Sequence, residues 1–383
     1  MLNQTNSNRF LSRVKKNKSL ILRTLLVLAL GGCTVTRMPQ LLSLSETTNA
    51  KPKITEFLDR NSLALGEDVR AAIPIQLNTF RQTNEILPYE CWEFAIATKT
   101  GRSSYLLWKI YTNVEDALAE QNHILKRLAQ TELPLAIPVV WDKAEPYAKA
   151  PSVLLMRPNG MSFAGCIAWK VKGNRIIDGS EYTDLIKRLL ELHTLPSSDS
   201  IDGFPVGDWL RQMAEVGVTR NDWDADTRNQ ILDIAKAWHS TRAATIHGDL
   251  TSQNVWVDST FSVTAMMDWE KLGTGDPAID LGYLLADATV IQPFEMRERY
   301  GIPLPESFSA TDIGKNIVHT YCNETHSELS PAVIANLRAA YTLRIIQTYL
   351  YQHNDPLLQV GMNRLHQYIP ALLANNPVAE MVK

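Results

Sequence analysis

The segment that most constrains this chain is a polar stretch between short apolar runs, Ile246–Asn254, which reads IHGDLTSQN. Two apolar runs follow between residues 255 and 267, and the polar turn between them predicts a β-hairpin. Asp249 and Asn254 come before this hairpin, and Asp268 comes directly after it. Because a hairpin returns the chain to the edge where it started, we expect these three side chains to converge.

The types and spacing of these side chains match the needs of phosphoryl transfer. That reaction requires a carboxylate to accept the proton of the attacking hydroxyl, and oxygen ligands to hold Mg²⁺ against the phosphates. Asp249 and Asn254 have the D-x-x-x-x-N spacing of a kinase catalytic loop, and Asp268 follows a strand, as the second metal-binding carboxylate of a kinase does. Any one of these residues alone is commonly a turn residue or a cap. The combination favours a phosphotransferase.

Three motifs resemble the aminoglycoside phosphotransferase and choline kinase family, the small-molecule branch of the protein-kinase-like fold. They are His247–Asn254, Asp268–Glu270 and Gly275–Leu281. The likeness extends over about residues 75–360. It implies a chain that uses ATP and Mg²⁺ to phosphorylate a hydroxyl group of a small molecule.

The resemblance also implies roles for individual residues. Asp249 would be the catalytic base, Asn254 and Asp268 the magnesium ligands, and His247 a supporting member of the catalytic loop. Within the third motif, Asp276 and Asp280 match family positions. Two interpretations of them stay open: contact with the substrate, or a structural role as helix cap and hydrogen-bond anchor for the catalytic loop.

A lysine on an apolar strand suggests the nucleotide side of the site. Lys109 comes eleven residues before Glu120, which shares a predicted helix face with Ala117 and Ile124. This arrangement matches the kinase ion pair that anchors phosphates. The alternative is a lysine that extends to solvent beside a solvated glutamate.

Two segments bear on how a nucleotide would bind. In place of the family's glycine-containing phosphate loop, Leu87–Trp92 reads LPYECW, which puts nucleotide affinity or turnover in doubt because backbone approaches phosphate most easily without a Cβ. The predicted hinge, where backbone groups of Met156 and Arg157 would meet adenine, is followed by Pro158. Proline has no N–H, so the donors must lie beside it.

The order of patterns predicts an α+β, two-lobed protein-kinase-like fold, with a strand-rich N-terminal lobe and a mostly helical C-terminal lobe. Strand patterns dominate to residue 156, a helix is expected from about residue 113, and helical patterns dominate from Tyr182. Gly173 and Asn174 predict a second hairpin over residues 171–176. We expect three parts: an extension over 1–45, a nucleotide-binding lobe over 54–157, and a catalytic and substrate-binding lobe over 158–383.

The N-terminal extension differs from the rest in charge. Residues 1–45 carry seven Lys and Arg and no acid, whereas the whole chain has a net charge of −3. A basic stretch, the apolar run at residues 24–30 and Gly31-Gly32-Cys33 resemble a bacterial lipoprotein signal. The alternatives are a disordered N-terminal extension, or an extension that is not part of the protein because translation starts at Met38. Since ATP is a cytosolic substrate, we favour a cytoplasmic protein over one anchored to a membrane through Cys33, with residues 1–33 at most associating with a lipid surface.

Composition excludes several other classes. Hydrophobic residues make up 45% and charged residues 21%, as in ordinary globular proteins, and the net charge of −3 argues against a nucleic-acid partner. The four cysteines form no CxxC pair, and His193, His239 and His319 stand singly, so a metallohydrolase is disfavoured. A pseudokinase-type binding or regulatory protein and a membrane-anchored lipoprotein remain as alternatives.

The acceptor and the oligomeric state are not defined by the sequence. Residues 290–383, the region expected to hold the acceptor, carry eight acids and seven bases. This balance gives little attraction for a polycation. We therefore expect a neutral or mixed-charge hydroxylic metabolite as the acceptor, and not an aminoglycoside.

Overall fold

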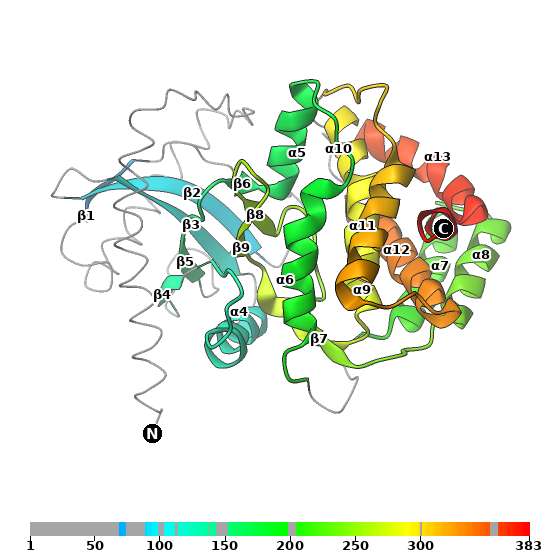
Figure 1. The fold of residues 1–383 in the computed structure, drawn as a ribbon, viewed down its shortest axis with the longest axis horizontal. Coiled ribbons are helices and arrows are strands. Elements are labelled where there is room, and N and C mark those ends of the chain that lie inside the picture. Colours follow the sequence, from blue (N-terminus) through cyan, green and yellow to red (C-terminus); the bar gives the residue numbers. More distant parts are fainter. Residues whose placement is uncertain are drawn as a thin grey trace.

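The computed structural model of this protein describes residues 69–73, 89–98, 103–111, 114–136, 138–142, 152–197, 204–298, 301–352 and 359–383. In Figure 1 a curved sheet lies on one side of the molecule and a bundle of helices on the other, so the predicted two-lobed α+β fold is confirmed. The predicted lipoprotein-like segment with Cys33 lies outside the described residues.

The N-terminal lobe is built on a five-stranded antiparallel sheet in the order β1-β2-β3-β5-β4. Its strands are β1 (Val69–Ile73), β2 (Tyr89–Thr98), β3 (Ser103–Tyr111), β4 (Pro138–Asp142) and β5 (Ser152–Met156). Apolar runs in the sequence predict strands over 92–97, 105–111, 136–141 and 153–156; the first, second and fourth fall on β2, β3 and β5, and the third corresponds to β4, which begins at Pro138. Because β3 is the middle strand, Lys109 pairs through its backbone with Cys91 on one side and Val153 on the other.

One helical segment of this lobe faces the C-terminal lobe. Helix α4 (Val114–Asn122) continues into η1 (His123–Leu128) and packs against η3 (Trp269–Lys271). The predicted inward face is confirmed, since Ala117, Glu120 and Ile124 are each at most 3% exposed. This helix therefore brings the Glu120 carboxylate to the boundary between the lobes.

The C-terminal lobe is mostly helical and surrounds two small sheets. Its helices are α5 (Phe163–Lys172), η2 (Ser180–Tyr182), α6 (Thr183–His193), α7 (Val206–Thr219), α8 (Ala225–Ala237), α9 (Ala278–Ala286), η4 (Asp287–Ile291), α10 (Gln292–Glu298), α11 (Ala310–Thr325), α12 (Pro331–Gln352), α13 (Gln359–Asn375) and α14 (Pro377–Met381). Helices α9 and α12 pack against each other along the centre of the lobe.

Short strands carry the polar motifs. The predicted hairpin is confirmed as β8 (Val255–Val257) and β9 (Val263–Met266), and β6 (Met161–Ser162) extends it to three strands. The other sheet pairs β7 (Ala244–Ile246) with β10 (Gly273–Gly275). The loop from β7 to β8 contains Asp249, and the loop from β9 to β10 contains Asp268, so both acids follow directly from buried strands.

Two hydrophobic clusters hold these elements. The large one fills the helical lobe and extends to Ile124 and Leu128 of η1. A smaller one lies between the lobes and contains Ala117, Ala136, Val153, Leu155 and Ala265, with Trp256 and Met267 packed against it. The apolar residues of β5 and of the β8–β9 hairpin therefore share one core, which fixes the sheet relative to the catalytic loop.

One sequence prediction is corrected, and the segment that stands in place of the phosphate loop is described only in part. Residues 171–176 do not form a hairpin: Val171 and Lys172 end helix α5, the N–H of Gly173 bonds to the Trp169 carbonyl, and Asn174 takes a left-handed φ of 53°. Gly-Asn here terminates a helix, a role for which both residues are also suited. Residues 89–92 of the expected phosphate loop belong to strand β2, and residues 87 and 88 lie outside the described part of the chain.

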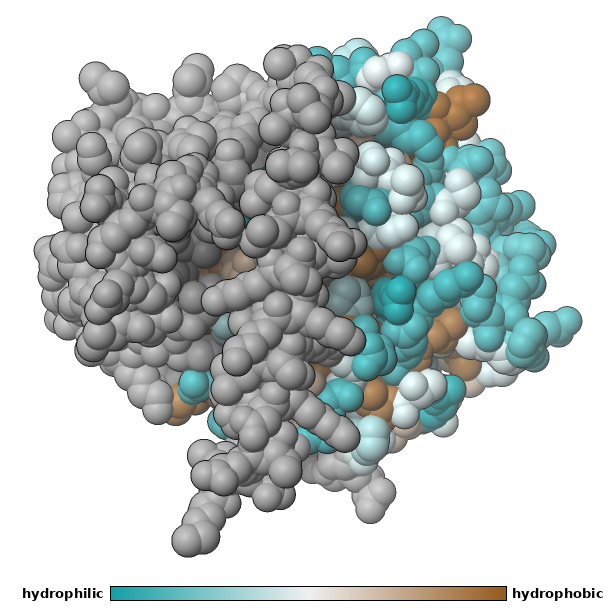
Figure 2. Space-filling view, turned by 60° about the vertical axis from the view of Figure 1, so that its left-hand side comes forward, coloured by the Kyte–Doolittle hydropathy of each residue, from teal (hydrophilic) through white to brown (hydrophobic). Residues whose placement is uncertain are grey.

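The visible surface of the helical lobe is mainly hydrophilic, with scattered apolar residues (Figure 2). Among the described helices, none combines the length and the hydrophobicity that a membrane crossing requires.

Candidate active site

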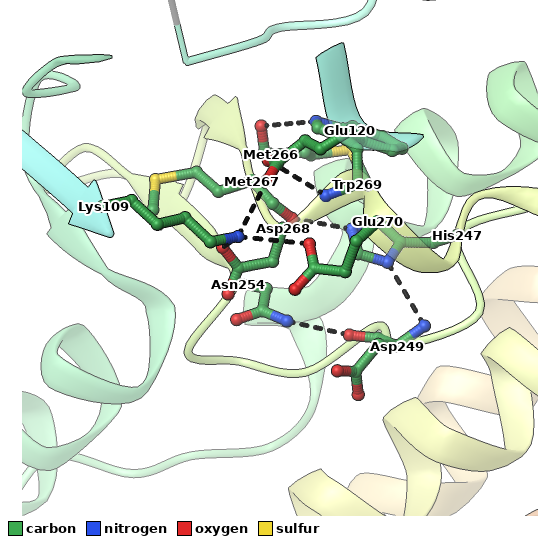
Figure 3. A network of polar contacts seen from close by, with 10 residues as sticks. All are labelled: Lys109, Glu120, His247, Asp249, Asn254, Met266, Met267, Asp268, Trp269 and Glu270. Atoms are coloured by element: carbon green, nitrogen blue, oxygen red, sulfur yellow. Dashed lines mark hydrogen bonds and ion pairs between the residues drawn. The ribbon is translucent and has the colours of Figure 1, made fainter. Parts of the chain in front are cut away.

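A buried lysine on the central strand lies among three carboxylates (Figure 3). The Nζ atom of Lys109 lies 2.8 Å from Oε2 of Glu120, 2.9 Å from Oδ1 of Asp268 and 3.1 Å from Oε2 of Glu270. Lys109 is only 2% exposed, so the interpretation as a lysine that reaches solvent is wrong. The predicted ion pair with Glu120 is present, and the same ammonium joins β3 and α4 to the segment that follows β9.

Among the described residues, the charges in this cluster are not balanced, since one ammonium faces three carboxylates. The pKa of Glu270 is raised to about 8: burial is the main cause, Lys109 opposes it, and the neighbouring Asp268 and Glu120 add to the rise. One oxygen from each of Glu120, Asp268 and Glu270 lies within 4.8 Å of the others. Buried carboxylates held this close need a shared proton or a cation, and hard oxygen donors suit Mg²⁺.

The raised pKa of Glu270 predicts a pH-dependent stability. Unfolding returns this carboxyl to its ordinary pKa, so between about pH 4.5 and 8 the unfolded chain binds fewer protons than the folded one, and wild-type stability falls as pH rises. We expect Glu270→Gln to remove this fall, at most about 1.4 kcal/mol per pH unit. The measurement is urea unfolding of both proteins at pH 5 and pH 8 in EDTA; a difference that stays constant between the two pH values contradicts the prediction.

The backbone of the catalytic loop is tied to helix α9 by one buried carboxylate. Asp280 accepts hydrogen bonds from the backbone N–H groups of His247 (2.8 Å) and Gly248 (2.9 Å), and its Oδ2 lies 3.1 Å from Nε2 of His193. Gly248 has a φ of +79°, and a Cβ there would lie 2.5 Å from the Lys271 carbonyl oxygen, so this position requires glycine. Of the two interpretations of Asp280, the structure supports a structural role, in which its carboxylate anchors the backbone of the catalytic loop by hydrogen bonds.

Asp276 also has a structural position. Its Oδ1 accepts a hydrogen bond from the N–H of Ala278, at the start of α9, and its Oδ2 accepts bonds from Thr241 and Asn336. It is 2% exposed. Asp276 therefore caps α9 and ties it to α12, as the structural interpretation expected.

His247 supports the loop through both ring nitrogens. Its Nε2 lies 2.9 Å from the Met267 carbonyl oxygen, and its Nδ1 accepts a bond from the N–H of Asp249 at 3.3 Å. These contacts assign the proton to Nε2. The ring is buried and packs on Trp269, with centroids 4.5 Å apart. His247 thus links the loop of Asp249 to the segment of Asp268.

Asp249, Asn254 and Asp268 are brought together as the hairpin predicted. The side-chain N–H of Asn254 donates to the backbone carbonyl of Asp249 at 2.9 Å, and the backbone carbonyl of Asn254 accepts a hydrogen bond from the N–H of Met267. Asp268 has φ 62° and ψ 60°, a left-handed conformation that is costly for a residue with a Cβ. That conformation starts η3, which turns both Asp268 and Glu270 toward Lys109.

We expect removal of the Asp280 carboxylate to destabilise the protein. In Asp280→Ala two buried backbone N–H groups lose their acceptor, at about 1–3 kcal/mol each. Urea unfolding should therefore show a loss of a few kcal/mol. The control is Asp208→Ala, whose side chain is 73% exposed and should change stability by no more than about 0.5 kcal/mol. Equal losses in the two variants would contradict the anchoring role.

The predicted hinge lies where strand β5 ends. Met156 is the last residue of β5, and the guanidinium of Arg157 lies over the Trp256 ring of β8, 4.5 Å from its centroid. Arg157 also donates to the Pro158 carbonyl at 3.3 Å. The Arg157 side chain therefore packs on the hairpin of the other lobe, which leaves its backbone as the part that could meet a base.

Sequence reasoning missed two residues of this site. Glu270 could have been found from the sequence, because it stands two positions after Asp268 in the Asp268–Glu270 motif. No sequence pattern pointed to Arg344. It lies on α12, 95 residues after Asp249, yet its Nη1 is 3.1 Å from Asp249 Oδ1. Among the residues that the structure describes, the group of three potential metal ligands is Glu120, Asp268 and Glu270, and it contains no histidine.

Comparisons with known proteins agree with this geometry. The sequence model of the phosphotransferase enzyme family (APH) matches residues 92–304, more than half of the chain. No curated protein matches the sequence.

Solved structures of phosphotransferases share the fold. A thermostable mutant of aminoglycoside phosphotransferase APH(4)-Ia, in a ternary complex with AMP-PNP and hygromycin B, has a TM-score of 0.52 and 12% identity over 84% of this chain and 98% of its own. A putative aminoglycoside phosphotransferase from Ralstonia eutropha JMP134 has a TM-score of 0.53 and 14% identity over 85% and 98%. Spectinomycin phosphotransferase APH(9)-Ia, in complex with ADP and spectinomycin, has a TM-score of 0.52 and 11% identity over 86% and 97%.

At these identities the structural neighbours establish the fold alone, whereas the sequence model establishes membership. With the kinase-type lysine and glutamate pair, the anchored HGD loop and the acids after β9 all in one place, the chain belongs to the APH phosphotransferase enzyme family and has its protein-kinase-like fold.

Proposed function

We propose that this chain is an ATP- and magnesium-dependent phosphotransferase that acts on a hydroxyl group of a small molecule. The observation that carries the proposal is the contact of Lys109 with both Glu120 and Asp268, beside a loop that presents Asp249. A lysine paired with a helical glutamate and a metal-binding aspartate is the arrangement by which kinases hold nucleotide phosphates.

On the donor side, Lys109 would bind the phosphates of ATP, and Glu120 would hold the lysine in place. Backbone groups at Met156 and Arg157 would meet the adenine. The structural neighbours solved with AMP-PNP and with ADP support nucleotide binding by this fold. Incoming phosphates would compete with Asp268 and Glu270 for the ammonium, so nucleotide binding should rearrange these ion pairs.

Asn254 and Asp268 would bind magnesium, and Glu270 offers a further carboxylate beside Asp268. The donors fit this ion, since carboxylate and amide oxygens are its usual protein ligands and the cluster has an excess of negative charge. When bound, Mg²⁺ neutralises charge that develops on the transferred phosphoryl group. The residues' own part is to hold oxygen donors at fixed positions at the boundary between the lobes.

On the acceptor side, Asp249 would take the proton of the attacking hydroxyl. The acceptor oxygen forms a bond to the γ-phosphorus while the bond to the β–γ bridging oxygen breaks, and ADP leaves. The Asp249 side chain is 38% exposed, so an acceptor from solvent has access to it. Positioning and electrostatic stabilisation should supply most of the rate enhancement.

A pseudokinase-type protein is the second candidate, favoured by the absence of glycine from residues 74–92, which include the connection from β1 to β2. Retention of Lys109, Asp249, Asn254 and Asp268 supports the enzyme instead. Consumption of ATP in the presence of magnesium separates the two.

The experiment that tests the proposal is a magnesium-ATP screen over pooled metabolites, with ADP release as the signal. The pools should contain sugars, amino alcohols, hydroxylated amino acids and kanamycin-type aminoglycosides. We expect turnover with a neutral or mixed-charge acceptor, since the acids and bases of residues 290–383 nearly balance. Efficient phosphorylation of the aminoglycosides would refute that choice of acceptor, and absence of any ATP turnover would favour the pseudokinase.

For location we propose the cytoplasm, where ATP is available. Mass spectrometry of the mature N-terminus tests this directly. Lipid on Cys33 would overturn the proposal in favour of a membrane-anchored protein.

A further inference from the structure

The proposed base is held by an arginine from a distant helix. Arg344, near the middle of α12, donates from Nη1 to Oδ1 of Asp249 at 3.1 Å. Within the described part of the chain, Arg344 is the one side chain that hydrogen-bonds to the Asp249 carboxylate. The two side chains are partly buried, at 20% exposed for Arg344 and 38% for Asp249.

The position of Arg344 is itself supported. Its guanidinium carbon lies 5.5 Å from the centroid of the Tyr283 ring of α9, within the range of a cation–π contact. The Tyr283 hydroxyl donates to Oε1 of Gln347, one helix turn further along α12. Among the described residues, the buried Nε of Arg344 has no hydrogen-bond partner, so the guanidinium makes its described side-chain hydrogen bond to Asp249.

The loop backbone is fixed independently of Arg344. Asp280 of α9 holds the N–H groups of His247 and Gly248, and Asp287 of η4 accepts from the N–H of Ser252 at 2.9 Å. These bonds place the Cα of Asp249 but leave its carboxylate free to rotate. Arg344 supplies the missing restraint, because it holds one of the two carboxylate oxygens.

We propose that Arg344 is a positioning residue for Asp249: by binding Oδ1, it directs Oδ2 toward the acceptor hydroxyl. The inference rests on the proposed function, and it adds a residue that the site motifs do not contain. Oδ2 would take the proton while Oδ1 stays bonded to the guanidinium, which remains charged at any pH relevant to the enzyme.

The charges around the pair also favour this role. Asp287 lies near both partners: burial is the main cause that raises its pKa, the Asp249 charge raises it, and Arg344 lowers it. The positive charge of Arg344 therefore favours the ionised form of Asp287, in addition to its ion pair with Asp249. A neutral side chain at this position would remove the ion pair that the structure describes for Asp249 and would let its carboxylate turn away from the acceptor.

The test uses Arg344→Gln, Arg344→Lys, Asp249→Asn and the double variant Arg344→Gln/Asp249→Asn. Each is assayed for ADP release from magnesium ATP with water as the acceptor, and then with the acceptor found in the screen. We expect Arg344→Gln to lower kcat by about 10- to 100-fold, the loss typical of a displaced catalytic group, with the KM for ATP unchanged. Arg344→Lys should recover part of this loss, since it keeps the charge without the planar fork.

Two comparisons separate positioning from a merely structural role. Arg338→Gln is the matched control: Arg338 lies on the same helix and donates to the Leu373 carbonyl, so the variant should keep kcat even if it lowers the melting temperature. In the Asp249→Asn background, Arg344→Gln should cause no further loss, because an interaction that acts through Asp249 is already absent.

The results separate this inference from the proposed function. If Asp249→Asn is strongly impaired and Arg344→Gln keeps wild-type kcat, Arg344 does not position the base. If Arg344→Gln causes its full loss again in the Asp249→Asn background, it acts directly on phosphate or acceptor, and the inference is overturned. If Asp249→Asn itself retains wild-type turnover, Asp249 is not the base and this inference is overturned, whereas the proposed function fails if the wild-type protein shows no turnover of magnesium ATP.

Discussion

Asp249→Asn is expected to lower kcat by about 10²-fold or more while nucleotide binding stays intact, because the variant keeps the shape of the side chain but cannot accept a proton. The carboxylate is partly exposed and makes one described side-chain contact, so the fold should tolerate the change. The measurements are ADP release at saturating magnesium ATP and calorimetric binding of ADP.

The matched control for this prediction is Asp233→Asn, on α8, where the side chain is 75% exposed and pairs only with Lys236 among the described residues. It makes the same chemical change away from the site and should leave kcat unchanged. Turnover of Asp249→Asn within a few-fold of wild type would show that Asp249 is not the base.

Asp268→Asn should produce a different defect, a loss of magnesium affinity. Replacing a carboxylate by an amide removes one negative charge from the metal site, and we expect the magnesium concentration for half-maximal activity to rise by about tenfold or more. Lys109 keeps Glu120 and Glu270 as partners, so the lobe boundary should stay assembled. The measurement is a titration of ADP release with Mg²⁺ at fixed ATP.

Each of these two variants serves as the control for the other. Asp249→Asn should lower kcat at every magnesium concentration without moving the midpoint of the titration, whereas Asp268→Asn should move the midpoint. An unchanged midpoint in Asp268→Asn would mean that Asp268 is not a metal ligand and that its main role is the ion pair with Lys109.

The local parts of this site could be predicted because they depend on neighbours in sequence. Asp249, Asn254 and Asp268 flank one hairpin, so the hairpin by itself brings them together. Lys109 and Glu120 lie on a strand and on the helix that follows it, and alternation on the strand and periodicity on the helix turn both inward. The error at Gly173 and Asn174 has the opposite cause: the same pair of residues ends a helix or turns a hairpin, and the packing of Phe163 and Val171 into the core selects the helix.

The sequence by itself determined the two-lobed order of elements, the residues that carry the candidate chemistry and the family resemblance, since these are encoded in short-range spacing and in periodic burial. Only the tertiary structure decided that three carboxylates share Lys109, that Asp280 anchors the catalytic loop and that Arg344 holds Asp249. Apart from the pair of Lys109 and Glu120, which are 11 positions apart, these contacts join residues that are 32 to 161 positions apart. The physical reason is that helix packing brings such groups into contact: α9 and α12 pack against each other, and Asp280 in the first turn of α9 and Arg344 near the middle of α12 then reach the loop.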